Sequence, residues 1–415
     1  MTQAGRPWAV GTVGAAPRLL GERPSERESL AAYEAAGGYA TGRLSGRALI
    51  DRVETIGLRG RGGAAFPAGV KLRSVADRPG PRYAVANGEE GEPASIKDRW
   101  LLCMRPHLVL DGLLLATHAV DAAGAIVYLS DAEAEASVAR ALDELRIPSS
   151  VVRIVRVAPG YVAGEESAAV RAIDGGPAKP TDKPPRPFEA GVGGASTLVS
   201  NVETLANVPS IAAGAGAGTM LATLSGAVAA PGLYELPLGL ALEEALDAAG
   251  GLTGPPRGFL MGGFFAGVLA PRALALPLDP DALRAEGSGL GCGAVVALGD
   301  NCPVAAAAAV MAYFARENAQ QCGPCIRGTA AMAGVLDRLA RGEADEAGLE
   351  RLRGWSVSLR GRGACGTLDG AANLAGSLLR EFGPLVDEHR TMPCTRCAEQ
   401  LDDDPGGGTR YALEY

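Results

Sequence analysis

The sequence predicts a multidomain α/β protein, in which a mostly parallel sheet is followed by a small α+β module and then by an all-α region. Short apolar strand patterns lie at 83–86, 125–130 and 151–157. They alternate with helical patterns such as 131–145, an order typical of a parallel sheet. Residues 221–269 combine further short strand patterns with one helix at 241–248. From Pro303 to about Phe382 the pattern is helical.

Length and composition limit the classes of protein that this chain can belong to. With 415 residues, 47% of them apolar, two or three packed domains are expected. The net charge of −8 argues against nucleic acid as a partner. No apolar run reaches the roughly 18 residues of a membrane span, and no signal peptide is evident, so we expect a cytoplasmic protein. Eight cysteines in such a chain favour metal or redox chemistry over a disulfide framework.

One glycine-rich stretch, Gly57 to Lys71, reads G-L-R-G-R-G-G-A-A-F-P-A-G-V-K. Glycine lets the backbone approach a ligand closely, and arginine carries a planar fork that suits phosphate. Lys71 adds a positive charge where a helix could begin, and helix starts bind anions. This pattern indicates a phosphate or cofactor cradle, although a glycine-rich surface turn would look similar. Its spacing matches neither the Walker A loop nor G-x-G-x-x-G.

Acidic residues gather in two further loops. The segment 87–93, N-G-E-E-G-E-P, follows the first strand pattern, at the edge of a parallel sheet where ligands bind. The segment G-E-E-S at 164–167 opens a helix that runs to Ile173. A solvated acidic turn and simple helix capping are the structural alternatives to a cofactor-facing role. The proline-rich loop 175–187 then carries Lys179, Lys183 and Arg186.

Composition shifts suggest the domain boundaries. Residues 1–44 are expected to be a loosely packed lead-in with one short helix near 25–36. A Gly/Ala linker at 213–219 marks the first boundary, and the acidic, Gly-rich tail after Cys394 and Cys397 is expected to fray. The predicted parts are 1–44, 45–214, 215–300, 301–388 and the tail 389–415.

Five motifs, in this order, resemble those of the NADH-binding flavoprotein subunit of respiratory complex I and the related diaphorase subunits of NAD-linked hydrogenases and formate dehydrogenases. They are G-L-R-G-R-G-G-A-A-F-P-A-G-V-K, N-G-E-E-G-E-P with K-D-R, G-E-E-S-A, N-V-E-T-L-A-N-V-P, and C-G-P-C with a distant C-G. The resemblance extends from about Ser45 to Glu388, and the joint order makes it specific.

The resemblance implies a Rossmann-like domain that binds FMN and NAD, a β-grasp (SLBB) domain, and a helical bundle with a [4Fe–4S] cluster. The implied activity is that of an FMN-dependent NADH dehydrogenase, which transfers hydride from NADH to FMN. Single electrons then leave through the cluster to a partner, expected to be a thioredoxin-like [2Fe–2S] ferredoxin subunit or another iron–sulfur acceptor. The flavin supplies the chemistry, and the protein positions and tunes it.

The family's functional residues can be carried over position by position. FMN would be held by Gly60, Arg61, Gly62, Lys71, Asn87, Glu89, Glu90, Gly164, Glu165, Ser200, Asn201 and Thr204. NADH would face Glu92, Glu166 and Lys183, with Phe66 stacking on the adenine. Glu92 and Glu166 are the two residues that we expect in the catalytic part of the site. Since hydride moves directly between stacked rings, the work of the site is alignment.

The cysteine pattern departs from the family. Members usually carry C-x-x-C-x-x-C and a distant fourth cysteine, but here Ala319 stands at the first position. Cys322, Cys325 and Cys365 remain, which is three thiolates where four are expected. A [3Fe–4S] centre, a [4Fe–4S] cluster with another ligand, rescue by Cys394 or Cys397, and loss of the cluster are the open alternatives.

The remaining cysteines allow a different metal site. Cys394 and Cys397 form C-x-x-C with His389 five residues before it, a set that could bind Zn²⁺ with a further ligand such as another chain's cysteine. Cys103, Cys292 and Cys302 lie in apolar or Gly-rich surroundings and are expected to be small buried residues.

The nucleotide side departs as well. The family's Lys-Pro-Pro-aromatic reads Lys183-Pro184-Pro185-Arg186 here, and Ser74 replaces another aromatic. Arg186 could stack by its guanidinium plane or bind a 2′-phosphate. Two competing functions therefore remain, namely an NADPH-preferring variant and an FMN-binding relay or scaffold that no longer turns over NADH.

Overall fold

The computed structural model describes residues 8–14, 17–403 and 411 of the chain. These residues form two compact units, which we describe separately. The parallel-sheet unit consists of Gly14–Gly91 and Ile96–Leu221. The mixed-sheet unit consists of the described residues up to Val13, the short segment Glu92–Ser95, and the described chain from Ala222 onwards.

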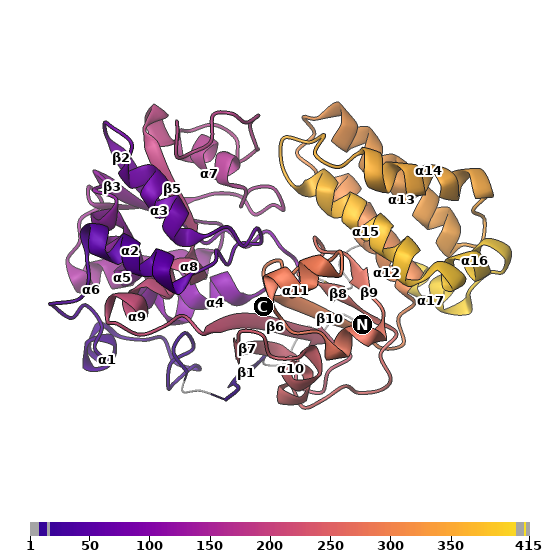
Figure 1. The fold of residues 1–415 in the computed structure, drawn as a ribbon, viewed down its shortest axis with the longest axis horizontal. Coiled ribbons are helices and arrows are strands. Elements are labelled where there is room, and N and C mark those ends of the chain that lie inside the picture. Colours follow the sequence, from indigo (N-terminus) through magenta and orange to yellow (C-terminus); the bar gives the residue numbers. More distant parts are fainter. Residues whose placement is uncertain (1–7, 15–16, 404–410, 412–415) are drawn as a thin grey trace. The chain divides into compact units, whose positions relative to one another are not determined.

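The parallel-sheet unit contains a four-stranded sheet in the order β4-β3-β2-β5 (Figure 1). Its strands are β2 (Arg82–Asn87), β3 (Gly124–Leu129), β4 (Val152–Arg156) and β5 (Ser196–Asn201). All three pairs of neighbouring strands are parallel, and Val85 lies beside Ile126 and Val199. These residues pack with Ile173 of helix α7 in one buried cluster. Apolar residues on neighbouring positions are typical of strands covered on both faces.

Helices surround this sheet. They are α1 (Leu30–Ala35), α2 (Gly46–Ile56), α3 (Ala68–Ala76), α4 (Lys97–Met104), α5 (Pro106–Ala119), α6 (Ala132–Leu145), α7 (Glu166–Ile173), α8 (Val202–Ala206) and α9 (Val208–Ala212), with a 3₁₀ turn at Val192–Gly194. Helix α6 begins where its sequence predicts, because the Asp131 side chain accepts from Ala134 N–H at 2.8 Å. Helix α2 ends at Gly57, whose φ of 71° is the left-handed conformation that glycine tolerates.

Strand β5 was not expected from the sequence. The polar residues Ser200 and Asn201 are typical of a helix start, but they are the last two residues of β5, and α8 begins at Val202. Asn201 does cap that helix, since its Oδ1 accepts from Glu203 N–H at 2.9 Å. The two roles overlap at one residue, and the local pattern reported only the cap.

The expectation of a loosely packed lead-in was wrong for its described residues. Strand β1 (Ala9–Thr12) pairs in parallel with β7 (Gly232–Pro237). Tyr33 is buried and donates its hydroxyl to Asp111 of α5 at 2.7 Å, and Arg43 grips the same carboxylate with two bonds of 2.7 and 2.8 Å. Long-range pairing and ion pairing of this kind leave no local signal in a Gly- and Pro-rich sequence.

The mixed-sheet unit is built on a six-stranded sheet in the order β1-β7-β6-β10-β8-β9 (Figure 1). Besides β1 and β7, its strands are β6 (Thr219–Gly226, whose first three residues belong to the other unit), β8 (Gly258–Met261), β9 (Val268–Leu269) and β10 (Ala294–Leu298). Helices α10 (Leu242–Ala248) and α11 (Pro280–Ala285) and a 3₁₀ turn at Pro271–Ala275 accompany it. The pairs β6–β10 and β1–β7 are parallel, and β8–β10 and β8–β9 are antiparallel.

In the described part of the chain, six helices follow the sheet in the same unit. They are α12 (Pro303–Glu317), α13 (Gly323–Ala340), α14 (Glu346–Ser358), α15 (Thr367–Glu381), α16 (Gly383–Thr391) and α17 (Thr395–Asp403). Helix α12 packs against α13 and α15, and α17 packs against α12. The predicted order of parallel sheet, α+β module and helical region is therefore confirmed. The expectation that the tail frays after Cys397 was wrong as far as Asp403, and the rest of it, except Tyr411, lies outside the described residues.

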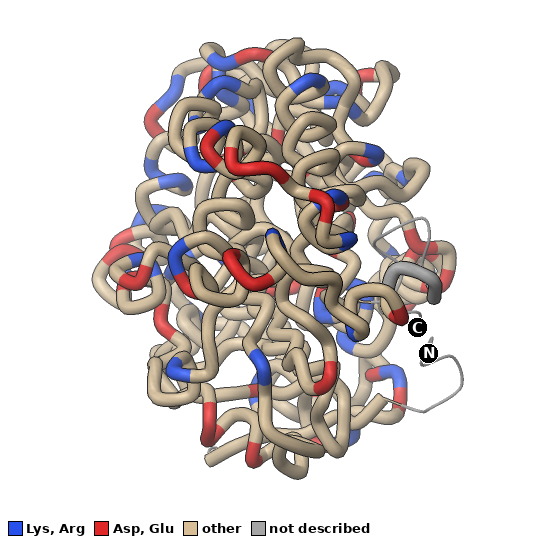
Figure 2. The backbone as a smooth tube through the Cα atoms, turned by 90° about the vertical axis from the view of Figure 1, so that its right-hand side faces the viewer, with Lys and Arg blue, Asp and Glu red and all other residues tan. Residues whose placement is uncertain are grey.

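Charged residues of both signs are intermixed along the chain in the view of Figure 2. Among the described residues, no single helix is long and apolar enough to cross a membrane. One bent pair, α4 with α5, has the combined length and apolar composition of a membrane span.

Candidate functional site

The glycine-rich stretch forms the loop between α2 and α3. Gly60 N–H donates to Phe66 O at 2.9 Å and closes the loop on itself. The backbone N–H groups of Gly62, Gly63 and Ala64 donate to no acceptor among the described residues. Successive N–H groups that lack a protein acceptor form a concave donor surface for an anion. The loop therefore has the backbone chemistry of a phosphate cradle.

The Arg61 side chain does not serve this cradle as its sequence suggested. It is buried, its Nη2 donates to Thr219 O at 3.2 Å, and its Nε lies 3.7 Å from Glu203 Oε1. Its backbone N–H donates to Thr204 Oγ1 at 2.8 Å. Arg61 and Thr204 thus fix the position of the loop through buried contacts.

Glu203, the partner of Arg61, also belongs to a buried cluster of charged residues. Lys97 is 0% exposed, and its Nζ lies 2.6 Å from Asp98 Oδ1 and 3.1 Å from Glu203 Oε2. Asn201 Nδ2 donates to the other Asp98 oxygen at 2.6 Å. Sequence reasoning missed Lys97, Asp98 and Glu203 as site residues. The available signal was a lysine and an aspartate in the first turn of α4, separated by one arginine from the apolar run W-L-L.

The carboxyl ends of β2 and β5 lie side by side, since Ala86 pairs with Ser200 and Asn87 with Asn201. This edge of a parallel sheet is where ligands bind in α/β folds. Asn87 Nδ2 donates to Gly164 O at 2.7 Å, so the loop before α7 is held at the same edge.

Glu89 and Glu90, which follow β2, have different roles. Glu90 caps α4, because its two carboxylate oxygens accept from the N–H groups of Asp98 and Arg99 at 3.1 and 2.9 Å. Glu89 is buried, its Oε1 accepts from Gly160 N–H at 3.3 Å, and its Oε2 has no hydrogen-bond partner among the described residues. A buried polar atom without a partner marks Glu89 as the residue of this loop that is prepared for a ligand.

Burial raises the pKa of Glu89 from 4.5 to about 7, against the lowering effect of the Gly160 N–H. A carboxyl whose pKa is higher in the folded state costs stability as the pH rises from the unfolded towards the folded value. In flavin-free protein, the free energy of unfolding of Glu89→Gln relative to that of the unmodified protein should therefore increase by about 3 kcal/mol as the pH rises from 4.5 to 7. Urea unfolding across this range measures the difference, with the exposed Glu133→Gln as control. A difference that does not depend on pH would contradict the burial argument.

Helix α7 begins with two carboxylates that face different cations. Glu165 caps the helix by accepting from Ser167 and Ala168 N–H at 2.9 and 3.2 Å, and its other oxygen binds Lys183 Nζ. Glu166 Oε2 lies 3.0 Å from Lys71 Nζ. Capping, the structural alternative, is thus correct for Glu165 and does not account for Glu166.

Glu166 also meets Arg186, whose Nη1 lies 3.5 Å from Oε1. Burial by itself would raise its pKa, but Lys71, Lys183 and Arg186 together hold the pKa of Glu166 below its usual range. Phe66, on the neighbouring loop, is 53% exposed although it is a large apolar residue. An ionised acid, several cations and an exposed aromatic face are the parts that a charged, aromatic ligand would use.

Glu92 belongs to the mixed-sheet unit and is described there. Its Oε1 accepts from Ala94 N–H at 3.3 Å, and its side chain covers Gly263, where an added Cβ would lie 2.2 Å from Glu92 Cδ. The close approach explains why residue 263, which has a φ of 75°, is glycine.

Three cysteines meet at the start of α13 and the loop before α15. Cys322 directly precedes α13, Cys325 lies in its first turn, and Ala364 N–H donates to Cys322 Sγ at 3.4 Å. Burial, with the neighbouring sulfurs of Cys365 and Cys322, raises the pKa of Cys325 to about 12. Ala319, at the family's first cysteine position, is buried. N–H donors to gathered sulfurs are typical of iron–sulfur sites.

Three segments of the chain match known domain families. Residues 53–210 match the family described as Nuo51 FMN-binding domain, 221–263 the SLBB domain, and 305–389 the NADH-ubiquinone oxidoreductase-F iron-sulfur binding region. The crystal structure of NAD⁺-reducing [NiFe]-hydrogenase in the H₂-reduced state is similar, with a TM-score of 0.74 and 29% identity over 89% of this chain and 68% of that chain.

Curated relatives cover most of the chain. The NADH-quinone oxidoreductase F 2 subunit of Rhizobium meliloti is 35% identical over 388 residues, which are 85% of this chain and 92% of the relative. The NADH-quinone oxidoreductase F subunit of Streptomyces coelicolor is 33% identical over 83% of each chain. With the parallel sheet, the glycine-rich loop and the gathered cysteines in the order that the resemblance implied, the chain belongs to the family of NADH-quinone oxidoreductase F subunits.

Proposed function

We propose that this chain is an FMN-dependent NADH dehydrogenase subunit, which takes hydride from NADH and passes electrons singly through an iron–sulfur centre to a partner protein. When bound, the flavin supplies the group that accepts hydride and gives up electrons one at a time. The observation that carries the proposal is the loop Gly57–Lys71 with its unpartnered N–H groups beside the carboxyl ends of β2 and β5.

The residues fit a flavin phosphate and its ring. The N–H groups of Gly62, Gly63 and Ala64 and the ammonium of Lys71 suit the phosphate. Glu89 offers a buried carboxyl oxygen without a partner. Gly60, Arg61, Glu90, Asn201 and Thr204 hold the loop and α4 in place, and Asn87, Gly164, Glu165 and Ser200 complete the same sheet edge.

For the nucleotide we propose that Glu166, Lys183 and Phe66 contact NADH. Glu166 is ionised and already surrounded by cations, so it can accept hydrogen bonds from ribose hydroxyls. Phe66 presents an exposed ring for an adenine to cover. Cys322, Cys325 and Cys365 would supply three thiolates to the iron–sulfur centre, with Ala319 at the family's first cysteine position.

We propose a thioredoxin-like [2Fe–2S] ferredoxin subunit as the electron acceptor and a cytoplasmic location, where thiols such as the eight free cysteines stay reduced. The parts 45–214, 215–300 and 301–388 would correspond to the flavin, SLBB and cluster domains. One observation favours an NADPH-preferring variant, namely that the Arg186 side chain is 58% exposed beside Glu166, where a 2′-phosphate could meet it.

An anaerobic titration of the FMN-loaded protein with NADH, and then with NADPH, tests the proposal through the flavin absorbance. We expect stoichiometric bleaching by NADH. Bleaching by NADPH alone would assign Arg186 to phosphate binding. Bleaching by neither, while dithionite still reduces the flavin, would overturn the dehydrogenase function in favour of an electron relay.

A further inference from the structure

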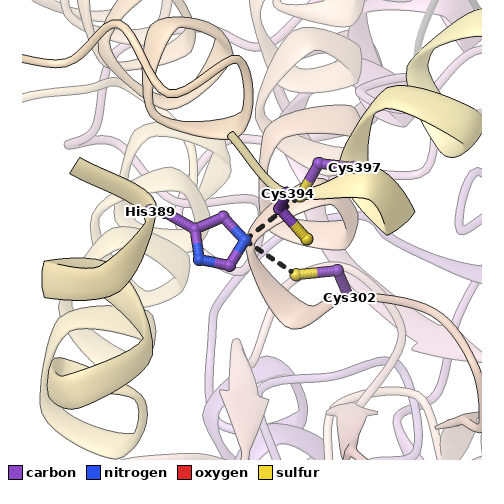
Figure 3. Close-up of side chains that lie close together, drawn as sticks. All are labelled: Cys302, His389, Cys394 and Cys397. Atoms are coloured by element: carbon purple, nitrogen blue, oxygen red, sulfur yellow. Dashed lines mark hydrogen bonds between the residues drawn. The ribbon is translucent and has the colours of Figure 1, made fainter. Parts of the chain in front are cut away.

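Four metal-ligating side chains from distant parts of the chain meet in the mixed-sheet unit (Figure 3). Cys302 is the N-cap residue of α12, His389 lies on α16, Cys394 precedes α17 and Cys397 lies in its first turn. Their ligand atoms all lie within 4.8 Å of one another. His389 Nε2 is 3.3 Å from Cys302 Sγ and 3.3 Å from Cys397 Sγ. None of these four residues belongs to the Cys322, Cys325 and Cys365 site.

The spacing of these atoms fits a single ion. Four ligands about 2.0–2.3 Å from a tetrahedral centre lie roughly 3.3–3.8 Å from one another. The two nitrogen–sulfur distances of 3.3 Å and the 4.8 Å limit agree with that size. A cube of four irons and four sulfides needs ligands much farther apart, so these four residues cannot hold the cluster for which Cys394 and Cys397 were considered.

The surroundings of His389 and Cys302 suit metal binding. His389 Nδ1 lies 2.8 Å from Leu385 O, and because a carbonyl can only accept, Nδ1 carries the proton and Nε2 offers its lone pair to the sulfurs. Cys302 is the N-cap residue of α12 and so lies at the positive end of that helix. Its own backbone N–H donates to Gln400 Oε1 at 3.2 Å.

An ordinary buried-cysteine interpretation does not account for this arrangement. Cys302 and Cys397 are 0% exposed and His389 is 4% exposed, so the imidazole nitrogen is shut away from water between two sulfurs. Thiols are weak hydrogen-bond partners, and a buried imidazole gains little from them. A cation satisfies all four groups at once.

We propose that Cys302, His389, Cys394 and Cys397 bind one Zn²⁺ in a closed tetrahedral site. Three cysteines and one histidine, with C-x-x-C spacing, form a ligand set that structural zinc sites use. The ligand that the sequence left open is Cys302 of the same chain, 87 residues before His389 in the chain. The ion fastens α16 and α17 to the start of α12, which packs on α13, the helix that carries Cys325.

Metal analysis of the full-length, flavin-loaded protein tests this site independently of NADH turnover. We expect about one zinc per chain, and Cys397→Ser should lower it to below about one-tenth of that value because ligand loss opens the site. His389→Cys, which keeps four ligands, should retain zinc. Two matched controls separate the sites, since Cys325→Ser should lower iron but not zinc, and Cys103→Ser should change neither.

Cobalt provides a readout that does not depend on variants. Replacement of zinc by Co²⁺ in the unmodified protein should give the visible absorption of a tetrahedral thiolate site. The proposal would be overturned by a protein that carries no zinc and takes up neither ion, by loss of iron instead of zinc in Cys397→Ser, or by a disulfide between two of the three cysteines in freshly purified protein.

Discussion

Replacing Glu166 by lysine should lower kcat/KM for NADH by about 100-fold while the protein keeps its FMN. A hydrogen bond to a charged group contributes about 1.5–3 kcal/mol, and each 1.4 kcal/mol is a factor of ten. The new ammonium would also stand beside Lys71, 3.0 Å from the present carboxylate, and beside Arg186. A site with this excess of positive charge should attract the 2′-phosphate of NADPH and therefore accept NADPH better than NADH.

The measurement is steady-state reduction of an artificial acceptor with NADH and with NADPH, together with the flavin content of each preparation. Glu166→Gln keeps the shape and loses the charge, so an intermediate loss is expected. Glu189→Lys makes the same charge change on a residue whose contacts are Arg78 and the Arg186 backbone, and it should leave kcat/KM unchanged. Unchanged NADH kinetics in Glu166→Lys would remove Glu166 from the nucleotide site.

Replacing Lys97 by methionine should destabilise the parallel-sheet unit by about 3–5 kcal/mol. Removing one partner of a buried ion pair leaves the other charge without compensation, and that is what costs the free energy. Lys97 is shared by Asp98 and Glu203. After its loss Arg61 would still lie 3.7 Å from Glu203, and Asp98 would keep the neutral Asn201 amide as a donor.

The loss should be larger at pH 8 than at pH 6. Burial raises the pKa of Asp98 against the lowering effect of Lys97, and without the lysine this pKa rises further. An acid with a raised folded pKa loses stability as pH rises. Urea unfolding measures the change in stability, and hydrogen exchange of the α4 and β2 amides shows whether it lies in this unit. Arg47→Ala, which removes an exposed pair with Asp77, is the control and should cost less than about 1 kcal/mol. A loss of that size in Lys97→Met would contradict the buried-cluster argument.

The sequence was most informative where the determinant is local. The Asp131 cap, the left-handed Gly57 and the apolar strands beside Val85 follow from residues within one turn or one strand. The joint order of motifs also predicted the family and the α/β fold. The cap, the glycine and the strands were predictable because each needs only neighbours in the chain.

Features that depend on distant partners were not predictable. Arg61 was interpreted as a phosphate ligand because its buried partner, Glu203, lies 142 residues further along the chain. Glu90 resembled a ligand-facing acid because the helix that it caps could not be placed against it. Cys302 looked like a small buried residue since its contacts are near the far end of the chain. In each case the partner of the residue could not be predicted from the sequence.

The division of the chain into two units has a consequence for synthesis. The chain passes from one unit to the other after Val13, Gly91, Ser95 and Leu221, so neither unit is a continuous segment. During translation β1 is made first, yet its partner β7 begins only at Gly232, after the entire parallel sheet. The nascent chain must therefore keep an unpaired strand from aggregating until β7 has been made. For the same reason, a fragment that starts at Ser45 would lack β1 and leave β7 as an unpaired edge strand, so expression should be designed on the whole chain.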